Sequence, residues 1–233
     1  LTTPIGNTAI GYEALTSNET GNYNTAVGKS ALANNTSQAN VAIGFSALST
    51  AGNGNENVAI GYEASKNTTS ATHNTIIGTS AGKNTTTGSN NTAVGRQALV
   101  SNTTGSRNVA IGKHALQSNT TASDNVAVGE RALSSNETGG SNVAIGRYAL
   151  LTLGTDVAGQ TVFGQLNVAI GQSALQSQNN DSMNTAVGAN CLSSCTTGNL
   201  NVAVGRLANN SLTTGSQNVT IGYSAAQTAT TCL

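Results

Sequence analysis

The chain has 233 residues, of which only 8% are charged and 3% aromatic, and its formal net charge is zero. So few large apolar side chains cannot fill a conventional globular core, and a neutral chain has no global field that would attract nucleic acid or an anionic membrane. No apolar run approaches the ~18 residues of a membrane span, so we expect neither a nucleic-acid partner nor membrane insertion.

A five-residue motif of the form Asn-Val/Thr-Ala-Ile/Val-Gly recurs thirteen times with small variations. Its glycines are 17 residues apart, except for one spacing of 16 and one of 25. A fixed period of this size is typical of a solenoid, in which each repeat buries the apolar face of its neighbour. Val, Ile and Thr prefer strands, and Asn, Ser and Gly disfavour helices. We predict an all-β parallel β-solenoid of thirteen coils, with residues 1–233 forming a single repeat array.

Within each repeat, numbered from its Asn as position 0, side chains alternate between two faces. Positions 1 and 3 are Val, Ile or Thr, whereas position 2 is nearly always Ala and position 4 is always Gly. Alternation along a strand sends these two sets to opposite sides. We expect the β-branched side to form the core of each coil. The Ala/Gly side would let another backbone come close, and we expect it to pack against a neighbouring subunit.

The Asn at position 0 is the same in every repeat. Stacked coils would align these side chains in a ladder, in which each amide donates and accepts hydrogen bonds along the stack. A polar track that binds a ligand is the alternative. The predicted structural ladder consists of Asn7, Asn24, Asn40, Asn57, Asn74, Asn91, Asn108, Asn125, Asn142, Asn167, Asn184, Asn201 and Asn218.

Positions 7 and 8, usually Ala and Leu, predict a second short strand that closes the coil. Positions 9 to 16 are rich in turn residues and predict an outer loop. The sequence Asn-x-Thr/Ser recurs in this loop, where it would be a glycan acceptor in a eukaryotic secreted protein and otherwise a turn residue. Its asparagines are Asn18, Asn35, Asn67, Asn84, Asn102, Asn119 and Asn136.

Position 5 gathers aromatic and basic residues, including five of the nine basic residues of the chain. Stacked coils would align them in a stripe that could bind a ligand, with aromatic rings stacking on sugars and cations holding acidic groups. A subunit boundary, or a charged edge that prevents aggregation of sheets, is the preferred alternative. The candidate binding stripe is Tyr12, Lys29, Phe45, Tyr62, Arg96, Lys113, Arg147, Arg206 and Tyr223.

The long spacing reflects an insertion of eight residues within 147–166. Insertions in solenoids often carry binding function, so this segment is a candidate protruding loop that contacts a receptor or a neighbouring filament. A bulge tucked against the adjacent coil is the alternative. The apolar and turn residues of this candidate are Val157, Gln160, Val162 and Phe163.

The three cysteines all lie in the last repeats. Cys191 and Cys195 are close enough to form a disulfide, and Cys232 could pair between chains. The two histidines and nine acidic residues show no catalytic triad, metal-spaced cluster or phosphate-binding loop. We therefore predict no enzymatic activity, no cofactor and no metal.

The repeated core Asn-Val/Thr-Ala-Ile/Val-Gly, followed by Ala at position 7, resembles the head repeats of trimeric autotransporter adhesins, the YadA-like family. The arrays also look like parts of phage tail fibres. The resemblance covers all thirteen copies and implies a left-handed β-roll, three chains packed side by side, and exposure on a cell or virion surface for attachment. The period is longer than the family's, and the chain shows no heptad neck or anchor segment.

Three functional hypotheses follow. The first is an extracellular adhesive or receptor-binding fibre that binds a host receptor or glycan as a homotrimer. Because neither end of the sequence shows a recognisable cap, the second is a structural subunit that polymerises end to end into an extracellular filament. The third is a monomeric solenoid that binds ice or another surface through its threonines.

Overall fold

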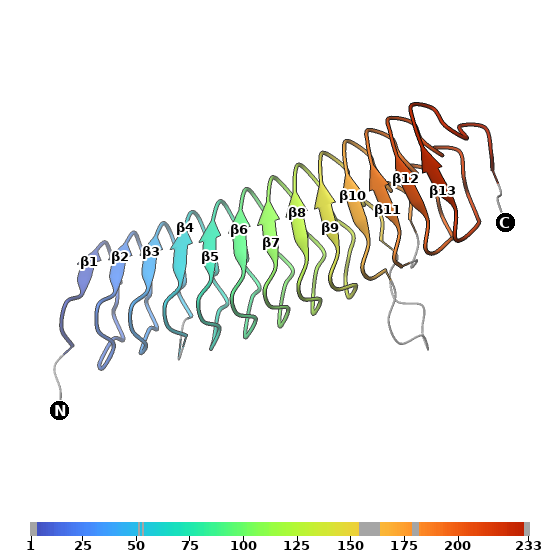
Figure 1. Ribbon diagram of the computed structural model, residues 1–233. Helices are drawn as coiled ribbons and strands as arrows, with labels where there is room; N and C mark the ends of the chain where they lie inside the picture. Colours follow the sequence, from blue (N-terminus) through green and yellow to red (C-terminus); the bar gives the residue numbers. More distant parts are fainter. Residues whose placement is uncertain (1–3, 51, 53, 154–163, 179–181, 231–233) are drawn as a thin grey trace. The chain divides into compact units, whose positions relative to one another are not determined.

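The computed structural model describes residues 4–50, 52, 54–153, 164–178 and 182–230. The chain divides into two compact units, Leu1–Lys113 and His114–Leu233. Each unit is a stack of β-solenoid coils, with one strand per coil and no helix among the described residues (Figure 1). The predicted all-β parallel solenoid is therefore confirmed.

Every strand is three residues long and occupies motif positions 1 to 3. The first unit contains β1 (Thr8–Ile10), β2 (Thr25–Val27), β3 (Val41–Ile43), β4 (Val58–Ile60), β5 (Thr75–Ile77), β6 (Thr92–Val94) and β7 (Val109–Ile111). The second contains β8 (Val126–Val128), β9 (Val143–Ile145), β10 (Val168–Ile170), β11 (Thr185–Val187), β12 (Val202–Val204) and β13 (Val219–Ile221).

Within each unit, consecutive strands pair in parallel and in register. Ala26 lies opposite Ala42 in the first unit, for example, and Ala144 lies opposite Ala169 in the second. The second pair shows that the insertion between β9 and β10 leaves the register unchanged. Equivalent positions therefore form continuous columns along each stack.

The predicted assignment of the two strand faces was wrong. Ala42 at position 2 is completely buried, whereas Ile43 at position 3 remains 38% exposed. The same contrast holds along both units, because position 2 is buried in β2 to β13 and positions 1 and 3 are half-buried or exposed. The β-branched side chains point out of the coil, and the small ones point into it.

The interior of each coil is narrow. Ala at position 7 and Leu at position 8 are buried opposite the Ala of position 2, as at Ala98, Leu99 and Ala93. The coils are numbered as their strands, so that coil 5 contains β5. Coil 5 reverses the sizes, with Ile76 at position 2 and Gly82 at position 8. A Cβ added to Gly82 would lie 3.1 Å from Ile76 Cδ1. In coils 5 and 6, the space between positions 2 and 8 therefore holds one large and one small residue.

The predicted second strand at positions 7 and 8 is absent from the described coils, where a turn takes its place. Its backbone alternates through the left-handed region, with φ of 55° at Gln97 and 56° at Leu99. This conformation is costly for residues other than glycine. It persists because backbone hydrogen bonds join the turns of neighbouring coils, as from the Leu32 N–H to the Ala47 carbonyl at 3.1 Å.

The glycine at position 4 allows neighbouring coils to approach closely, a role that the sequence analysis had assigned to a neighbouring subunit. Gly78 has φ of 136°, and a Cβ added there would lie 2.7 Å from the carbonyl carbon of Gly95 in the next coil. The backbones of two stacked coils are hydrogen-bonded to each other and cannot move apart to make room for a Cβ at position 4. The glycine column is thus required by coil stacking within the chain.

The position-0 asparagines form a buried polar column in each unit. The Oδ1 of each accepts the backbone N–H of the next, at 2.8 Å from Asn91 to Asn74. In most coils the Nδ2 donates across the same coil to the carbonyl of position 14, at 3.0 Å from Asn74 to Gly88; in the shorter second coil, Asn24 donates to the Ser37 carbonyl at position 13. The first unit carries this column from Asn7 to Asn108 and the second from Asn125 to Asn218. Each Asn thus closes its own coil and joins it to the next.

Position 11, assigned to the outer loop from the sequence, is also interior. Asn35, Asn102, Asn119 and Asn136 are buried there, and their Nδ2 atoms donate to turn carbonyls three or fewer residues further on. Buried amides cannot accept a glycan, so at these four positions the glycan-acceptor interpretation is wrong.

The disulfide considered from the sequence is also absent. Cys191 and Cys195 are both buried, and no disulfide joins them. Cys191 Sγ donates instead to the Ala203 carbonyl at 3.2 Å, and burial raises the pKa of this thiol to about 11. The candidate protruding loop with Val157, Gln160, Val162 and Phe163 lies outside the described residues, as does Cys232.

Candidate functional site

The outward face of the strands is a continuous surface of β-branched side chains. Positions 1 and 3 are Val, Ile or Thr in all thirteen strands, with no charged residue among them. Parallel register stacks like on like, as where Ile43 lies opposite Ile60. Each unit therefore presents an uncharged, mainly aliphatic sheet face.

Coils 1 to 4 bring the first four residues of the predicted stripe together. Lys29 Nζ lies 5.4 Å from the ring centroid of Tyr12 and 6.0 Å from that of Phe45. The rings of Phe45 and Tyr62 stack with centroids 5.2 Å apart and an interplanar angle of 11°. All four side chains are exposed, Phe45 to 41% and Tyr62 to 51%. We call these four residues the aromatic cluster.

The rest of the stripe is discontinuous. Thr79 occupies position 5 after Tyr62, and Arg96 and Lys113 follow as exposed cations. In the second unit, Glu130 occupies position 5 before Arg147.

The second unit holds two separate cation–aromatic pairs. Arg147 Nε pairs with Glu130 Oε2 at 3.3 Å, and its guanidinium lies 4.4 Å from the Tyr148 ring centroid. The Arg206 guanidinium lies 5.8 Å from the ring centroid of Tyr223. The structure therefore contains an extended aromatic cluster only at coils 1 to 4, as far as the described residues go.

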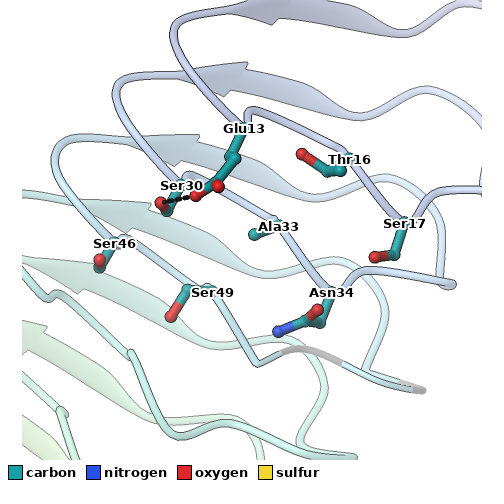
Figure 2. Close-up of a pocket in the computed structure, with 8 residues that line it drawn as sticks. All are labelled: Glu13, Thr16, Ser17, Ser30, Ala33, Asn34, Ser46 and Ser49. Atoms are coloured by element: carbon teal, nitrogen blue, oxygen red, sulfur yellow. Dashed lines mark hydrogen bonds between the residues drawn. The ribbon is translucent and has the colours of Figure 1, made fainter.

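A polar pocket of about 380 Å³ lies on coils 1 to 3. Figure 2 shows its lining side chains gathered from three consecutive coils. Ser30 Oγ donates to Glu13 Oε2 at 3.1 Å. Ser46 and Ser49 are only 7% and 8% exposed, and no hydrogen bond joins either hydroxyl to another described residue. The lining residues are Glu13, Thr16, Ser17, Ser30, Ala33, Asn34, Ser46 and Ser49.

The pocket and the aromatic cluster are adjacent in every coil that they share. Tyr12, Lys29 and Phe45 at position 5 are each followed directly by a pocket residue at position 6. The hydrogen bond and the negative charge of the neighbouring Glu13 carboxylate raise the pKa of Tyr12 above its usual value. One surface therefore combines exposed rings, a carboxylate and several hydroxyls.

An ion cluster occupies the next coils on the same face. Glu63 Oε1 and Oε2 pair with Lys66 Nζ at 2.8 Å and Lys83 Nζ at 2.7 Å. These two hydrogen bonds lower the pKa of Glu63. Lys66 and Lys83 stand at position 9, where coils 1 to 3 have Thr16, Ala33 and Ser49. Within coils 1 to 5, the pocket therefore lies where position 9 is small, and it ends where Lys66 and Lys83 begin.

The pocket was not predicted from the sequence. A signal was nevertheless present, because coils 1 to 3 have small or short polar residues at position 9 and, in two of them, Ser at position 6. It was missed because these positions were assigned to a second strand and an outer loop, whose side chains could not be placed on a common face.

The comparisons with known proteins assign no family. No family model matches the chain, and neither a curated protein nor a solved structure shows significant similarity to it. Within the described ranges, no three His, Cys, Asp or Glu side chains group as metal ligands would. Among the same residues there is also no helix of the length and apolarity that crossing a membrane requires.

Proposed function

We propose that this chain is a subunit of an extracellular fibrous surface protein, which assembles side by side as a homotrimer and attaches to a receptor or glycan. The observation that carries the proposal is the outward strand face of Val, Ile and Thr. The resemblance of the repeats to adhesin heads supports three copies and an extracellular location.

The outward face is of the size that often serves as a contact surface. In the first unit, seven strands about 4.8 Å apart, each with three residues of about 3.3 Å, span roughly 30 by 10 Å, or about 300 Å². The largest apolar patch on a soluble monomer is about this size and is often functional. Two stacks placed together along this face would shield it in both partners.

The chemistry of the face favours a second copy of the same chain. It contains no charge to be desolvated, and its columns of Val, Ile and Thr repeat at the coil spacing, so two copies offer β-branched side chains to each other at every coil. On one side of the strand, charged residues begin at position 5, beyond the motif glycine. On the other side they begin at position 16 of the preceding repeat, as at Glu56 and Arg107. Both sets would lie at the rim of such an interface.

The oligomeric state of the full chain tests this proposal. We expect multi-angle light scattering to give three times the monomer mass of 23.2 kDa. Replacing Val58 and Ile60 by Lys should yield monomers that retain the β-sheet circular dichroism signal, because both side chains point outward. The matched control, Ser89→Lys on the loop side, should remain trimeric. A monomeric wild-type protein would overturn the proposed assembly, and indefinite fibres would favour the end-to-end filament.

A variant of three basic residues of the stripe tests attachment separately from assembly. We expect the triple variant of Arg96, Lys113 and Arg147 to Ser to keep the wild-type mass. If this variant stays trimeric but loses adhesion to cells or glycan-coated surfaces that the wild type binds, the ligand-binding interpretation holds. If it dissociates instead, the stripe is a subunit boundary.

A further inference from the structure

We propose that coils 1 to 4 form a binding site for a neutral oligosaccharide, with the aromatic cluster as a stacking platform and the adjacent pocket as the hydroxyl-binding part. This inference deepens the proposed attachment function and rests on it. It assigns the ligand class and the residues that contact the ligand.

The aromatic cluster supplies the apolar half of the site. Phe45 and Tyr62 stack with their rings nearly parallel and remain about half exposed. Aromatic side chains are enriched at binding interfaces, where their rings supply large contact areas. The C–H faces of a sugar ring are flat and apolar, and they match such a platform while leaving the sugar hydroxyls free at their edges.

The pocket supplies the polar half. Ser46 and Ser49 place two hydroxyls at the pocket, and neither hydroxyl bonds to another described residue. The exposed Asn34 carboxamide and the Glu13 carboxylate stand at the same pocket. Together they offer donors and acceptors that a ligand rich in hydroxyl groups can satisfy.

The balance of charge favours a neutral ligand. Glu13 is the one charged side chain that lines the described pocket, and a second carboxylate there would be repelled. Lys29 already lies between the Tyr12 and Phe45 rings, which act on its ammonium group through the cation–π attraction. An acidic glycan would therefore be repelled by the Glu13 carboxylate, and the Lys29 ammonium group that could attract it already interacts with two rings.

Two substitutions test the two halves with residues that the same repeat positions already carry elsewhere in the chain. Phe45→Thr removes a ring and introduces the residue found at position 5 of coil 5. Ala33→Gln fills the pocket with the residue found at position 9 of coil 7. The matched controls are Gln172→Thr at position 5 of coil 10, outside the predicted stripe, and Val100→Gln at position 9 of coil 6. Neither residue lines the pocket.

The assay is calorimetric titration of the full-length chain with maltohexaose, cellohexaose, chitohexaose and mannohexaose. Hexagalacturonate serves as the acidic comparison and decaproline as the polypeptide comparison. We expect at least one neutral hexasaccharide to bind, and each of the two test variants to weaken that binding about tenfold or more. The two controls should bind as the wild type does.

Absence of binding to all four neutral hexasaccharides would overturn the inference, as would binding restricted to hexagalacturonate or decaproline. Equal affinity of wild type and both test variants would also overturn it. Light scattering on the same samples keeps the two proposals apart. Binding by a monomeric wild type would refute the trimer alone, whereas a trimer that binds none of the probes would refute the oligosaccharide site alone.

Discussion

Replacing Asn74 by Leu should strongly destabilise the first unit, because it removes one member of the buried asparagine column. The Asn91 N–H donates to Asn74 Oδ1 at 2.8 Å, and the Gly88 carbonyl accepts from Asn74 Nδ2 at 3.0 Å. Leu fills the space but can replace neither bond. Two buried polar groups left without partners cost about 1–3 kcal/mol each, so we expect the free energy of unfolding to fall by about 2–6 kcal/mol.

Urea unfolding followed by circular dichroism, together with amide hydrogen exchange, measures this loss. Exchange at the Asn91 amide should accelerate most, because in a stacked array the damage falls first on the neighbouring coil. The control is Asn34→Leu, which changes an exposed Asn whose side chain bonds to no other described residue and should shift stability by no more than about 0.5 kcal/mol. If Asn74→Leu were as stable as this control, the asparagine column would not hold the coils together.

Three further predictions address other features of the coil. Gly78→Ala should cost more than about 3 kcal/mol in urea unfolding, because its Cβ would meet the Gly95 backbone in a φ region that L-residues avoid. Gly52→Ala, where the nearest atom is 3.4 Å away, should cost far less, and similar losses would contradict the proposed coil contact. Because lysine hydrogen bonds lower the folded-state pKa of Glu63 below its usual 4.5, the stability that they provide should be present above pH 4.5 and be lost as pH falls through the lowered pKa. Thermal unfolding of wild type and Glu63→Gln should therefore converge in acid, and a constant difference would refute the coupling. With its pKa raised to about 11, Cys191 should react with a thiol reagent at neutral pH only after denaturation, in a variant whose other cysteines are serine; rapid reaction of the native protein would contradict its burial.

The candidate site could be predicted only in part. Periodicity alone places Tyr12, Lys29, Phe45 and Tyr62 at one repeat position, and coil stacking then brings them together. The pocket beside them depends on the turn at positions 6 to 9, whose left-handed residues, such as Ser30 and Ser46, direct side chains in a way that no strand pattern describes. Strand alternation therefore could not predict which residues line the pocket.

The sequence by itself determined the period, the place of the strand in each coil and the register, because a motif repeated every 17 residues can stack in parallel only like on like. It did not determine which strand face is inside, because alternation assigns residues to two faces without showing which of the two is buried. The tertiary structure decided this through the width of the coil, which accommodates Ala opposite Leu but leaves no room for a column of Val and Ile. The sequence of coil 5 already contains one sign of this narrow interior, because Ile76 at position 2 occurs together with Gly82 at position 8. A larger side chain at one position is compensated by a smaller one at the other only when both share the same confined interior.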